Sequence, residues 1–460
     1  MFKKEVYEER RRRLASMINE GLVFLPGSVD VPMNYPANIY KWRQDSNFLY
    51  FFGLDYPRMA AIIDVDNGTE MVFGDDVSLD DIIWMGPQPS TSELARQVGV
   101  EQTMPYAGLR EKIAEAFDKG RKIHFLPPYR AETQILLESL LGIQPGNLKA
   151  NASEQLIRAV VQLRSVKDEY EIAELEKAME TAWLMHTTAM KMAQPGVWER
   201  EIAGTIEGIA LSAGGMLSFP AIVTKRGETL HNHYHGNLLQ KGDLLLVDAG
   251  AETPMHYASD HTRTTPVGGR FSEKQKEIYQ AVLNAQIAAI EAIKPGETNF
   301  NVHMLAARTL AEGLKSIGLM KGDMTAAVEL GAHALFMPHG LGHMMGLDVH
   351  DMEDLGENFV GYDDKVKRST LFGTAFLRLG REYQPGFVLT VEPGCYFIPA
   401  LIDQWRSEGK FSEFINYDAV ESYRDFGGIR IEDDILVTAD GHRILGKPIP
   451  KSIQEIEALF

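Results

Sequence analysis

Four carboxylates of this chain stand at or beside the ends of short apolar stretches that have the length of a strand. Asp248 and Glu392 each follow directly on such a stretch, Asp260 lies in the extended segment after the first one, and Glu432 closes a stretch near the C-terminus. A charge at the buried end of a strand is costly unless a proton or a cation neutralises it. The pattern therefore favours a fold that brings the ends of distant strands together around a cation.

The segment from residue 244 to residue 264 predicts a hairpin. Asp248 and Asp260 are symmetric about Pro254, so a chain reversal there would place the two carboxylates opposite or nearly opposite each other. Directly opposed side chains have Cβ atoms about 4.5–5.5 Å apart, and like charges at that distance favour a hard cation between them. For each carboxylate taken singly, the alternative is a strand-edge charge that faces water.

A glycine-rich segment, residues 337–351, contains three histidines: His339, His343 and His350. So much glycine argues against a continuous helix, and His339 and His343 are therefore predicted to lie on a loop rather than to form a helical zinc clasp. The alternative is a solvated turn that happens to contain histidines.

One histidine with four carboxylates forms an oxygen-rich ligand set: Asp248, Asp260, His343, Glu392 and Glu432. Such a set suits Mn²⁺, Mg²⁺ or Fe²⁺ and differs from the Cys-rich set of a structural zinc site. Because four carboxylates carry more negative charge than one divalent ion neutralises, two metal ions are expected. A pair of ions about 3.5–4 Å apart is an arrangement typical of hydrolases.

A second histidine run occupies residues 231–235, where His231, His233 and His235 alternate with other residues. On a strand all three would share a face and could bind a metal of their own. The alternative, which we favour, is one functional histidine, because the carboxylate site already accounts for the metals. By the same period of two, Arg430 and Glu432 are expected to share one face.

The bulk composition limits the classes of protein. A chain of 460 residues is too long for one ordinary core, and its net charge of −18 disfavours binding to nucleic acid. The single cysteine, Cys395, excludes an intrachain disulfide and favours a reducing compartment. No apolar run approaches the ~20 residues of a membrane span, and no secretory signal is evident, so a cytoplasmic protein without membrane contact is expected.

The chain predicts an α+β architecture of two domains. Residues 1–150 alternate strands and helices as a smaller mixed α/β domain does, and residues 151–460 form the second domain. The stretch 165–168 has the form of a capping box at a helix start. Helix, Pro-Gly, helix then occurs twice, around Pro195 and Pro295, which favours an internal duplication over coincidence.

Together, six motifs resemble the pita-bread metallopeptidase family, which includes aminopeptidase P, prolidase, methionine aminopeptidase and creatinase. The matching pieces are Val247-Asp248-Ala249-Gly250, Ser259-Asp260-His261-Thr262-Arg263, Pro338-His339-Gly340-Leu341-Gly342-His343, Asp348-Val349-His350-Asp351, Thr390-Val391-Glu392-Pro393-Gly394 and Gly428-Ile429-Arg430-Ile431-Glu432-Asp433. The first 150 residues resemble the N-terminal domain of aminopeptidase P and prolidase, which methionine aminopeptidases lack. The resemblance implies a C-terminal pita-bread catalytic domain.

The resemblance also implies roles for the five ligands. Asp260 and Glu432 would bridge two metal ions, Asp248 would complete the site of one ion, and His343 with Glu392 would complete the other. Glu392 would in addition act as the proton shuttle. Manganese is the favoured metal, with cobalt, zinc or iron as alternatives.

Further residues would act on the substrate. By resemblance, His233 and His350 would line the substrate pocket and stabilise the tetrahedral intermediate, His339 would support them, and Arg430 would anchor substrate or orient Glu432. Arg378 would bind the carboxylate of a dipeptide, because an arginine fork pairs bidentately with such a group. The alternative is that Arg378 is a surface residue of the insertion at 355–382.

The implied reaction is hydrolysis of the bond before a proline in second position of a di- or oligopeptide. Prolidase is slightly favoured over Xaa-Pro aminopeptidase, both for Arg378 and for the long segment 397–426. A homodimer or higher homo-oligomer is expected. The rivals are a creatinase-type amidinohydrolase and a pita-bread binding module without catalysis, and the presence of all five ligands argues against both.

Overall fold

The computed structural model describes all 460 residues, and these form two compact units. The first unit is Met1–Arg164 with Glu353–Phe359, and the second is Ser165–Met352 with Val360–Phe460. The expected boundary near residue 150 stays a prediction about where the domains can be separated. No helix combines the length and the apolar character that crossing a bilayer requires.

The first unit is built on a mixed five-stranded sheet of order β6-β5-β4-β1-β7, in which β1 pairs antiparallel with β4 and parallel with β7. A short exposed hairpin, β2–β3, stands apart from it. The strands are β1 (Leu22–Pro26), β2 (Pro32–Tyr35), β3 (Asn38–Ile39), β4 (Ala60–Asp64), β5 (Thr69–Phe73), β6 (Gln102–Met104) and β7 (Ile123–His124).

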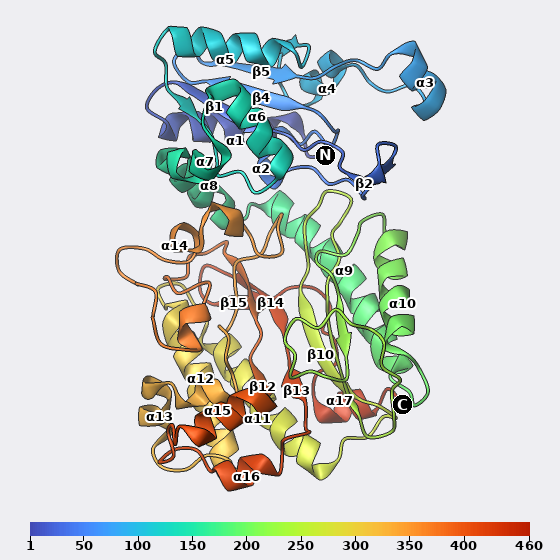
Figure 1. Cartoon of the computed structure of the whole chain (residues 1–460), viewed down its shortest axis with the longest axis vertical. Helices are drawn as coiled ribbons and strands as arrows, with labels where there is room; N and C mark the ends of the chain where they lie inside the picture. Colours follow the sequence, from blue (N-terminus) through green and yellow to red (C-terminus); the bar gives the residue numbers. More distant parts are fainter. The chain divides into compact units, whose positions relative to one another are not determined.

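Helices surround this sheet (Figure 1). Side chains of α5, α6 and α7 pack on the sheet in one apolar cluster that includes Phe24, Ile62 and Ile113. The helices are α1 (Lys4–Met17), α2 (Ser46–Phe52), α3 (Leu79–Met85), α4 (Thr91–Gln97), α5 (Gly108–Asp118), α6 (Ala131–Leu141), α7 (Pro145–Asn151) and α8 (Glu154–Ser165), with the short turns η2 (Glu353–Leu355) and α14 (Glu357–Val360) nearer the C-terminus.

The second unit contains three small antiparallel sheets, of order β10-β9-β8, β11-β14-β15 and β12-β13. Every residue of β9, β10 and β14 is buried, so these strands are covered on both faces. The strands are β8 (Ile222–Thr224), β9 (Leu244–Ala249), β10 (His261–Pro266), β11 (Val388–Val391), β12 (Gly394–Tyr396), β13 (Gly428–Arg430), β14 (Asp433–Val437) and β15 (His442–Ile444).

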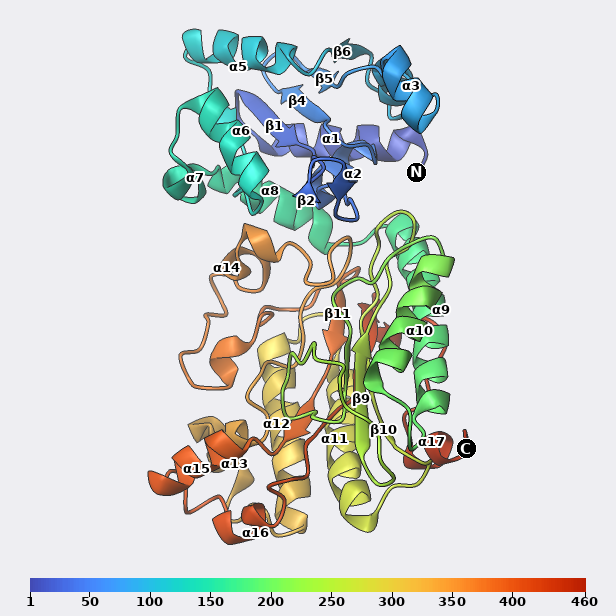
Figure 2. The ribbon, with the colours of Figure 1, turned by 45° about the vertical axis from the view of Figure 1, so that its right-hand side comes forward.

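Two long helix pairs enclose these strands. Figures 1 and 2 show α9 and α10 on one side of β9 and β10, with α11 and α12 on the other side. Each pair is joined through a Pro-Gly turn whose glycine, Gly196 or Gly296, has a positive φ, as the sequence pattern predicts. The helices are α9 (Glu169–Met192), α10 (Glu199–Ser212), α11 (Glu273–Ala292), α12 (Asn299–Ser316), α13 (Met324–Leu330), η1 (Ala332–Leu335), η3 (Thr374–Phe376), α15 (Pro399–Ser407), α16 (Tyr417–Glu421) and α17 (Ile453–Glu457).

One predicted helix cap is wrong by three residues. The cap of α9 is Asp168, whose carboxylate accepts from the backbone N–H of Glu171 and whose own N–H donates to the Glu171 side chain. Ser165, the predicted cap, instead ends α8. Asp168 can act as the cap because a glutamate follows it three residues later and completes the reciprocal hydrogen-bond pattern of a capping box.

Candidate active site

Asp248 and Asp260 face the same side of the β9–β10 hairpin, but not in the predicted register. Asp248 pairs with Thr262, and Asp260 lies just before β10. The two carboxylates are therefore diagonal neighbours rather than directly opposed, because the reversal is longer than one centred on Pro254. Diagonal side chains on one face are still within reach of a shared ligand.

The glycine-rich segment runs as a loop along β11, as predicted, and brings His343 to the carboxylates. Thr390 donates its N–H to the His343 carbonyl, and the N–H of His343 donates to the Thr390 hydroxyl oxygen. A Cβ on Gly342 would lie 2.0 Å from the Thr390 carbonyl oxygen, so only glycine allows this approach. Glu392 follows β11 directly, and its N–H donates to the carbonyl of Leu341.

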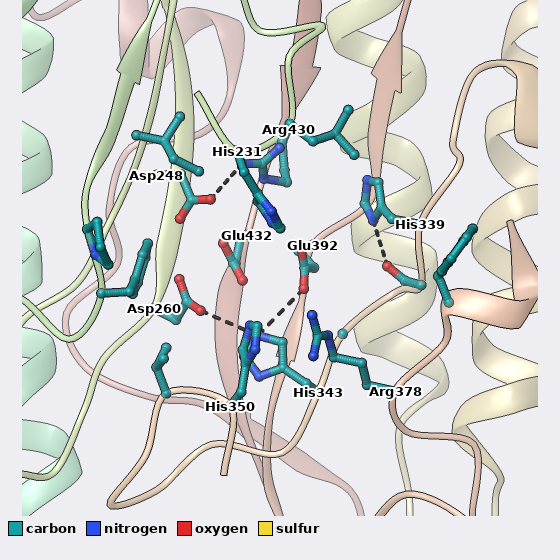
Figure 3. Close-up of a pocket in the computed structure, with 18 of the residues that line it drawn as sticks. His231, Asp248, Asp260, His339, His343, His350, Arg378, Glu392, Arg430 and Glu432 are labelled. Atoms are coloured by element: carbon teal, nitrogen blue, oxygen red, sulfur yellow. Dashed lines mark hydrogen bonds and ion pairs between the residues drawn. The ribbon is translucent and has the colours of Figure 1, made fainter. Parts of the chain in front are cut away.

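Glu432 lies between β13 and β14, opposite β10. Its N–H donates to the Thr262 carbonyl over 3.0 Å, and its carboxylate accepts from the Thr262 hydroxyl over 2.6 Å. Ligand atoms of Asp260, His343 and Glu432 all lie within 4.8 Å of one another, and all three residues are buried. Figure 3 shows these groups turned toward one another.

This cluster fits a divalent cation. The Oδ1 atoms of Asp248 and Asp260 are buried without a hydrogen-bond partner, which is costly unless a ligand satisfies them. Burial first, and then neighbouring carboxylates, raise the pKa of Asp260 and of Glu432 well above their usual values, and burial raises the pKa of Glu392 to about 8. Such carboxylates would bind protons unless a cation took their place.

His343 is prepared as a neutral ligand. Its Nε2 lies 3.4 Å from a carboxylate oxygen of Asp260 and 3.7 Å from one of Glu392. Its Nδ1 lies 3.0 Å from the Met344 carbonyl, so the proton belongs on Nδ1 and the lone pair on Nε2. Burial first, and then His350, lower the pKa of His343 well below its usual value.

Arg430 connects the ligands to a second group of polar residues. It donates to Asp248 over 2.6 Å, to the Thr262 hydroxyl over 3.1 Å and to the Tyr396 hydroxyl over 2.8 Å. His339 Nδ1 donates to the Gly340 carbonyl over 2.7 Å, so its Nε2 accepts from Tyr396 over 2.9 Å. Burial is the main cause that lowers the pKa of His339 to about 4, so the ring is neutral.

The ligands line a cavity of about 460 Å³. The predicted substrate residues His233, His339, His350, Arg378 and Arg430 all line it as well. Arg378 is half-buried in its wall, which argues against an isolated surface position. The apolar part of the lining is Phe219, Pro220, Ile222, Leu230, Pro338, Val349 and Phe376.

Some cavity residues were not predicted. His231 lines the cavity beside His233, whereas His235 turns away and lies 3.1 Å from the Ala221 carbonyl. Residues 231–235 form no strand, so the period of two does not apply to them. Thr262 stands inside a predicted motif, but no local pattern marks Tyr396 as the partner of His339.

The fold and the site together define a metal-dependent hydrolase with a separate N-terminal unit. Residues 173–439 match the description Metallopeptidase family M24, and residues 7–124 match Aminopeptidase P, N-terminal domain. The chain belongs to metallopeptidase family M24. Membership confirms the expected enzyme class, the pita-bread fold behind a smaller α/β domain, and the use of divalent metal.

Relatives cover nearly the whole chain. The human Xaa-Pro dipeptidase is 31% identical over 98% of this chain and 90% of its own length, and a probable Xaa-Pro aminopeptidase of Fusarium vanettenii is 34% identical over 97% and 95%. A substrate complex of an Escherichia coli aminopeptidase P variant superposes with a TM-score of 0.82 at 28% identity, covering 100% of this chain and 98% of that one. The Pseudomonas aeruginosa aminopeptidase PepP gives 0.81 at 27%, with the same coverage.

Proposed function

We propose that this enzyme hydrolyses the bond between the first residue and a proline in second position of short peptides, with two divalent metal ions. The observation that supports it most is the convergence of all five expected ligands on one cavity. The names of the relatives supply the Xaa-Pro specificity, which no feature of the cavity alone specifies.

In this proposal Asp248, Asp260, His343, Glu392 and Glu432 would hold the metal ions. Bound ions would polarise the scissile carbonyl and acidify a water molecule. Manganese is favoured for an oxygen-rich set, with cobalt, zinc or iron as alternatives. Glu392 is assigned the proton transfer because its side chain is 20% exposed toward the cavity, against 7% for Asp260.

The remaining polar lining residues are assigned to the substrate. His233 and His350 would donate hydrogen bonds to the oxygen on which charge develops, where preorganised donors act most strongly. His339 is a positioning residue in this scheme, because its two ring nitrogens are already engaged by Gly340 and Tyr396. Arg430 would orient Asp248 and, through Thr262, Glu432.

The test is a substrate panel on protein stripped with a chelator and then reloaded with Mn²⁺, Co²⁺, Zn²⁺ or Fe²⁺. We expect hydrolysis of Ala-Pro, little of Ala-Ala, none of creatine, and activity only in reloaded samples. Asp260→Asn is the control variant that should stay folded but bind less metal. Full activity of the metal-free protein, or equal kcat/KM for Ala-Pro and Ala-Ala, would contradict the proposal.

We further infer a preference for dipeptides, which rests on Arg378. This guanidinium lines the same cavity as Glu392 and His343, and its positive charge contributes to lowering the pKa of both. A fork at this position can pair with the C-terminal carboxylate of a dipeptide, whereas a longer peptide has an uncharged carbonyl there.

Arg378→Ala should therefore raise the KM for Ala-Pro by roughly 10-fold or more, in line with the ~1.5–3 kcal/mol of a charged hydrogen bond, and leave that for Ala-Pro-Ala nearly unchanged. Arg378→Lys should restore part of the loss, because it keeps the charge without the fork. If wild type cleaves the tripeptide as well as the dipeptide, and Arg378→Ala affects both alike, the enzyme is better described as an aminopeptidase P.

Two broader proposals follow the family. A homodimer or higher homo-oligomer is expected, and the mass in solution by light scattering would show it. A cytoplasmic location, proposed from the single cysteine, would be contradicted if the protein were recovered in a secreted or membrane fraction of the cell.

A further inference from the structure

A fully buried ion pair lies beside the cavity and takes no part in the proposed reaction. Lys167 Nζ lies 2.6 Å from the Asp351 carboxylate, and both side chains are only 1% exposed. Replacement of such a pair by apolar residues is often neutral or even stabilising, so stability by itself does not account for it. The position of the ion pair indicates a function other than stability.

Asp351 closes the loop that contains the cavity histidines. Its N–H donates to the Met344 carbonyl over 2.9 Å, and the N–H of Gly346 donates to the Asp348 carbonyl over 3.0 Å. A Cβ on Gly346 would lie 2.7 Å from the Asp351 carboxylate and 2.9 Å from Lys167 Nζ. The loop therefore packs closely against this charged contact.

Two cavity histidines lie next to the ends of this closure, the proposed metal ligand His343 and the proposed substrate residue His350. His343 is the residue before Met344 and His350 is the residue before Asp351, and their ring centroids are 4.1 Å apart. The rotation of His350 thus depends on where the backbone of Asp351 is held. A shift of about 1 Å in such a group can cost on the order of 100-fold in rate.

Lys167 is fixed independently of the loop. Its N–H donates to the Gly386 carbonyl over 2.8 Å, and the next residue, Asp168, is the cap of α9. Lys167 and Asp351 both belong to the second unit. The ion pair therefore joins the histidine loop to the segment that leads into α9.

We propose that Lys167 is a positioning residue that, through Asp351, holds His350 in its working orientation. The inference rests on the proposed function, because it needs His350 to contact the substrate. It also explains why a charge is buried on each side: an ion pair between the residue before a helix cap and a loop specifies one geometry, whereas apolar contacts allow several.

The test is a double-mutant cycle with Mn²⁺-loaded enzyme and Ala-Pro. Lys167→Met with Asp351→Leu removes both charges, so the variant should fold and keep its metal content. We expect its kcat to fall by roughly 10- to 100-fold, as for other residues that orient catalytic groups, with KM changing less. In a His350→Ala background the same pair of substitutions should cause no further loss.

Arg11→Met serves as the matched control. Arg11 is a buried cation of the first unit, paired with Glu70 and bonded to backbone carbonyls, so its loss should lower Tm and leave kcat unchanged. Losses that multiply in the His350→Ala background, or a wild-type kcat in the charge-free pair variant, would overturn the inference alone. A wild-type kcat in His350→Ala itself would overturn the role assigned to His350 and the inference with it, whereas a wild type that fails to hydrolyse Ala-Pro would overturn the proposed function.

Discussion

At the scale of single residues, two buried histidines outside the cavity should make the free energy of unfolding depend on pH. His303 on α12 and His333 on η1 are 0% and 1% exposed, with ring centroids 6.1 Å apart. Both ring nitrogens of His303 lack a hydrogen-bond partner. Burial is the main cause that lowers the pKa of His303 to about 3 and that of His333 to about 4.

The sign of the pH dependence follows from these pKa values. Below about pH 6.5 the histidines of the unfolded chain bind protons, whereas those of the native chain stay neutral until about pH 4. The unfolded state then holds more protons, so the free energy of unfolding falls as the pH falls through this window. Each histidine should contribute a loss of about 2 kcal/mol between pH 7.5 and pH 5.

His303→Met should remove one histidine's share of this loss. Urea unfolding of wild type and variant at pH 7.5 and pH 5 measures it, and the variant should lose about 2 kcal/mol less than wild type. Met304→Leu, a change without a titrating group on the same helix, should keep the wild-type difference. An unchanged pH dependence in His303→Met would mean that the native histidine binds its proton normally.

At the scale of elements, one arginine connects the strand ends that carry the proposed metal ligands. The Arg263 guanidinium, on β10, donates to the carbonyls of Thr262 and Glu432, to the Asp433 carboxylate and to the carbonyl of Ile449. Asp433, at the start of β14, also accepts from Lys451 Nζ over 2.6 Å. The segment before α17 thereby helps to fix the strand ends that carry Asp260 and Glu432.

Lys451→Met should lower the free energy of unfolding by about 1.5–3 kcal/mol, because Asp433 loses one of its charged hydrogen bonds in a buried position. Lys451→Arg should recover most of this, because it keeps the charge. Lys447→Met, a change of the neighbouring lysine that lies over the Trp183 ring, is the matched control for loss of a cation. Equal stability of Lys451→Met and wild type would show that Arg263 and Gln286 together satisfy Asp433.

At the scale of the whole molecule, all five proposed metal ligands belong to the second unit. A ligand stabilises only the structure that binds it, by about 2.7 kcal/mol when its free concentration is 100 times Kd. Mn²⁺ should therefore slow hydrogen exchange in peptides of the second unit and leave those of the first unit unchanged.

Asp260→Asn should abolish this protection. Mass spectrometry of exchange with and without Mn²⁺ reports both units in one experiment. Equal protection of both units would show that they unfold together and would count against a separable N-terminal domain.

Local pattern was sufficient for the parts of this protein that depend on neighbours in sequence. The apolar strands with a carboxylate at their end, the Pro-Gly turn between paired helices and the glycine-rich histidine loop all occupy the predicted places. Backbone preference, burial and turn chemistry act over a few residues, so these features can be predicted from the sequence alone. The α+β class and the membership of the family rest on these short-range patterns.

Only the tertiary structure decided which distant groups meet. The pairing of Asp248 with Thr262 depends on the length of a reversal that no local signal measures, and Lys167 contacts Asp351 across 184 positions. His231 faces the cavity because an irregular loop, not a strand, carries it there. Such contacts are chosen by packing and by the need to pair every buried charge, and these are properties of the assembled core rather than of any stretch of chain.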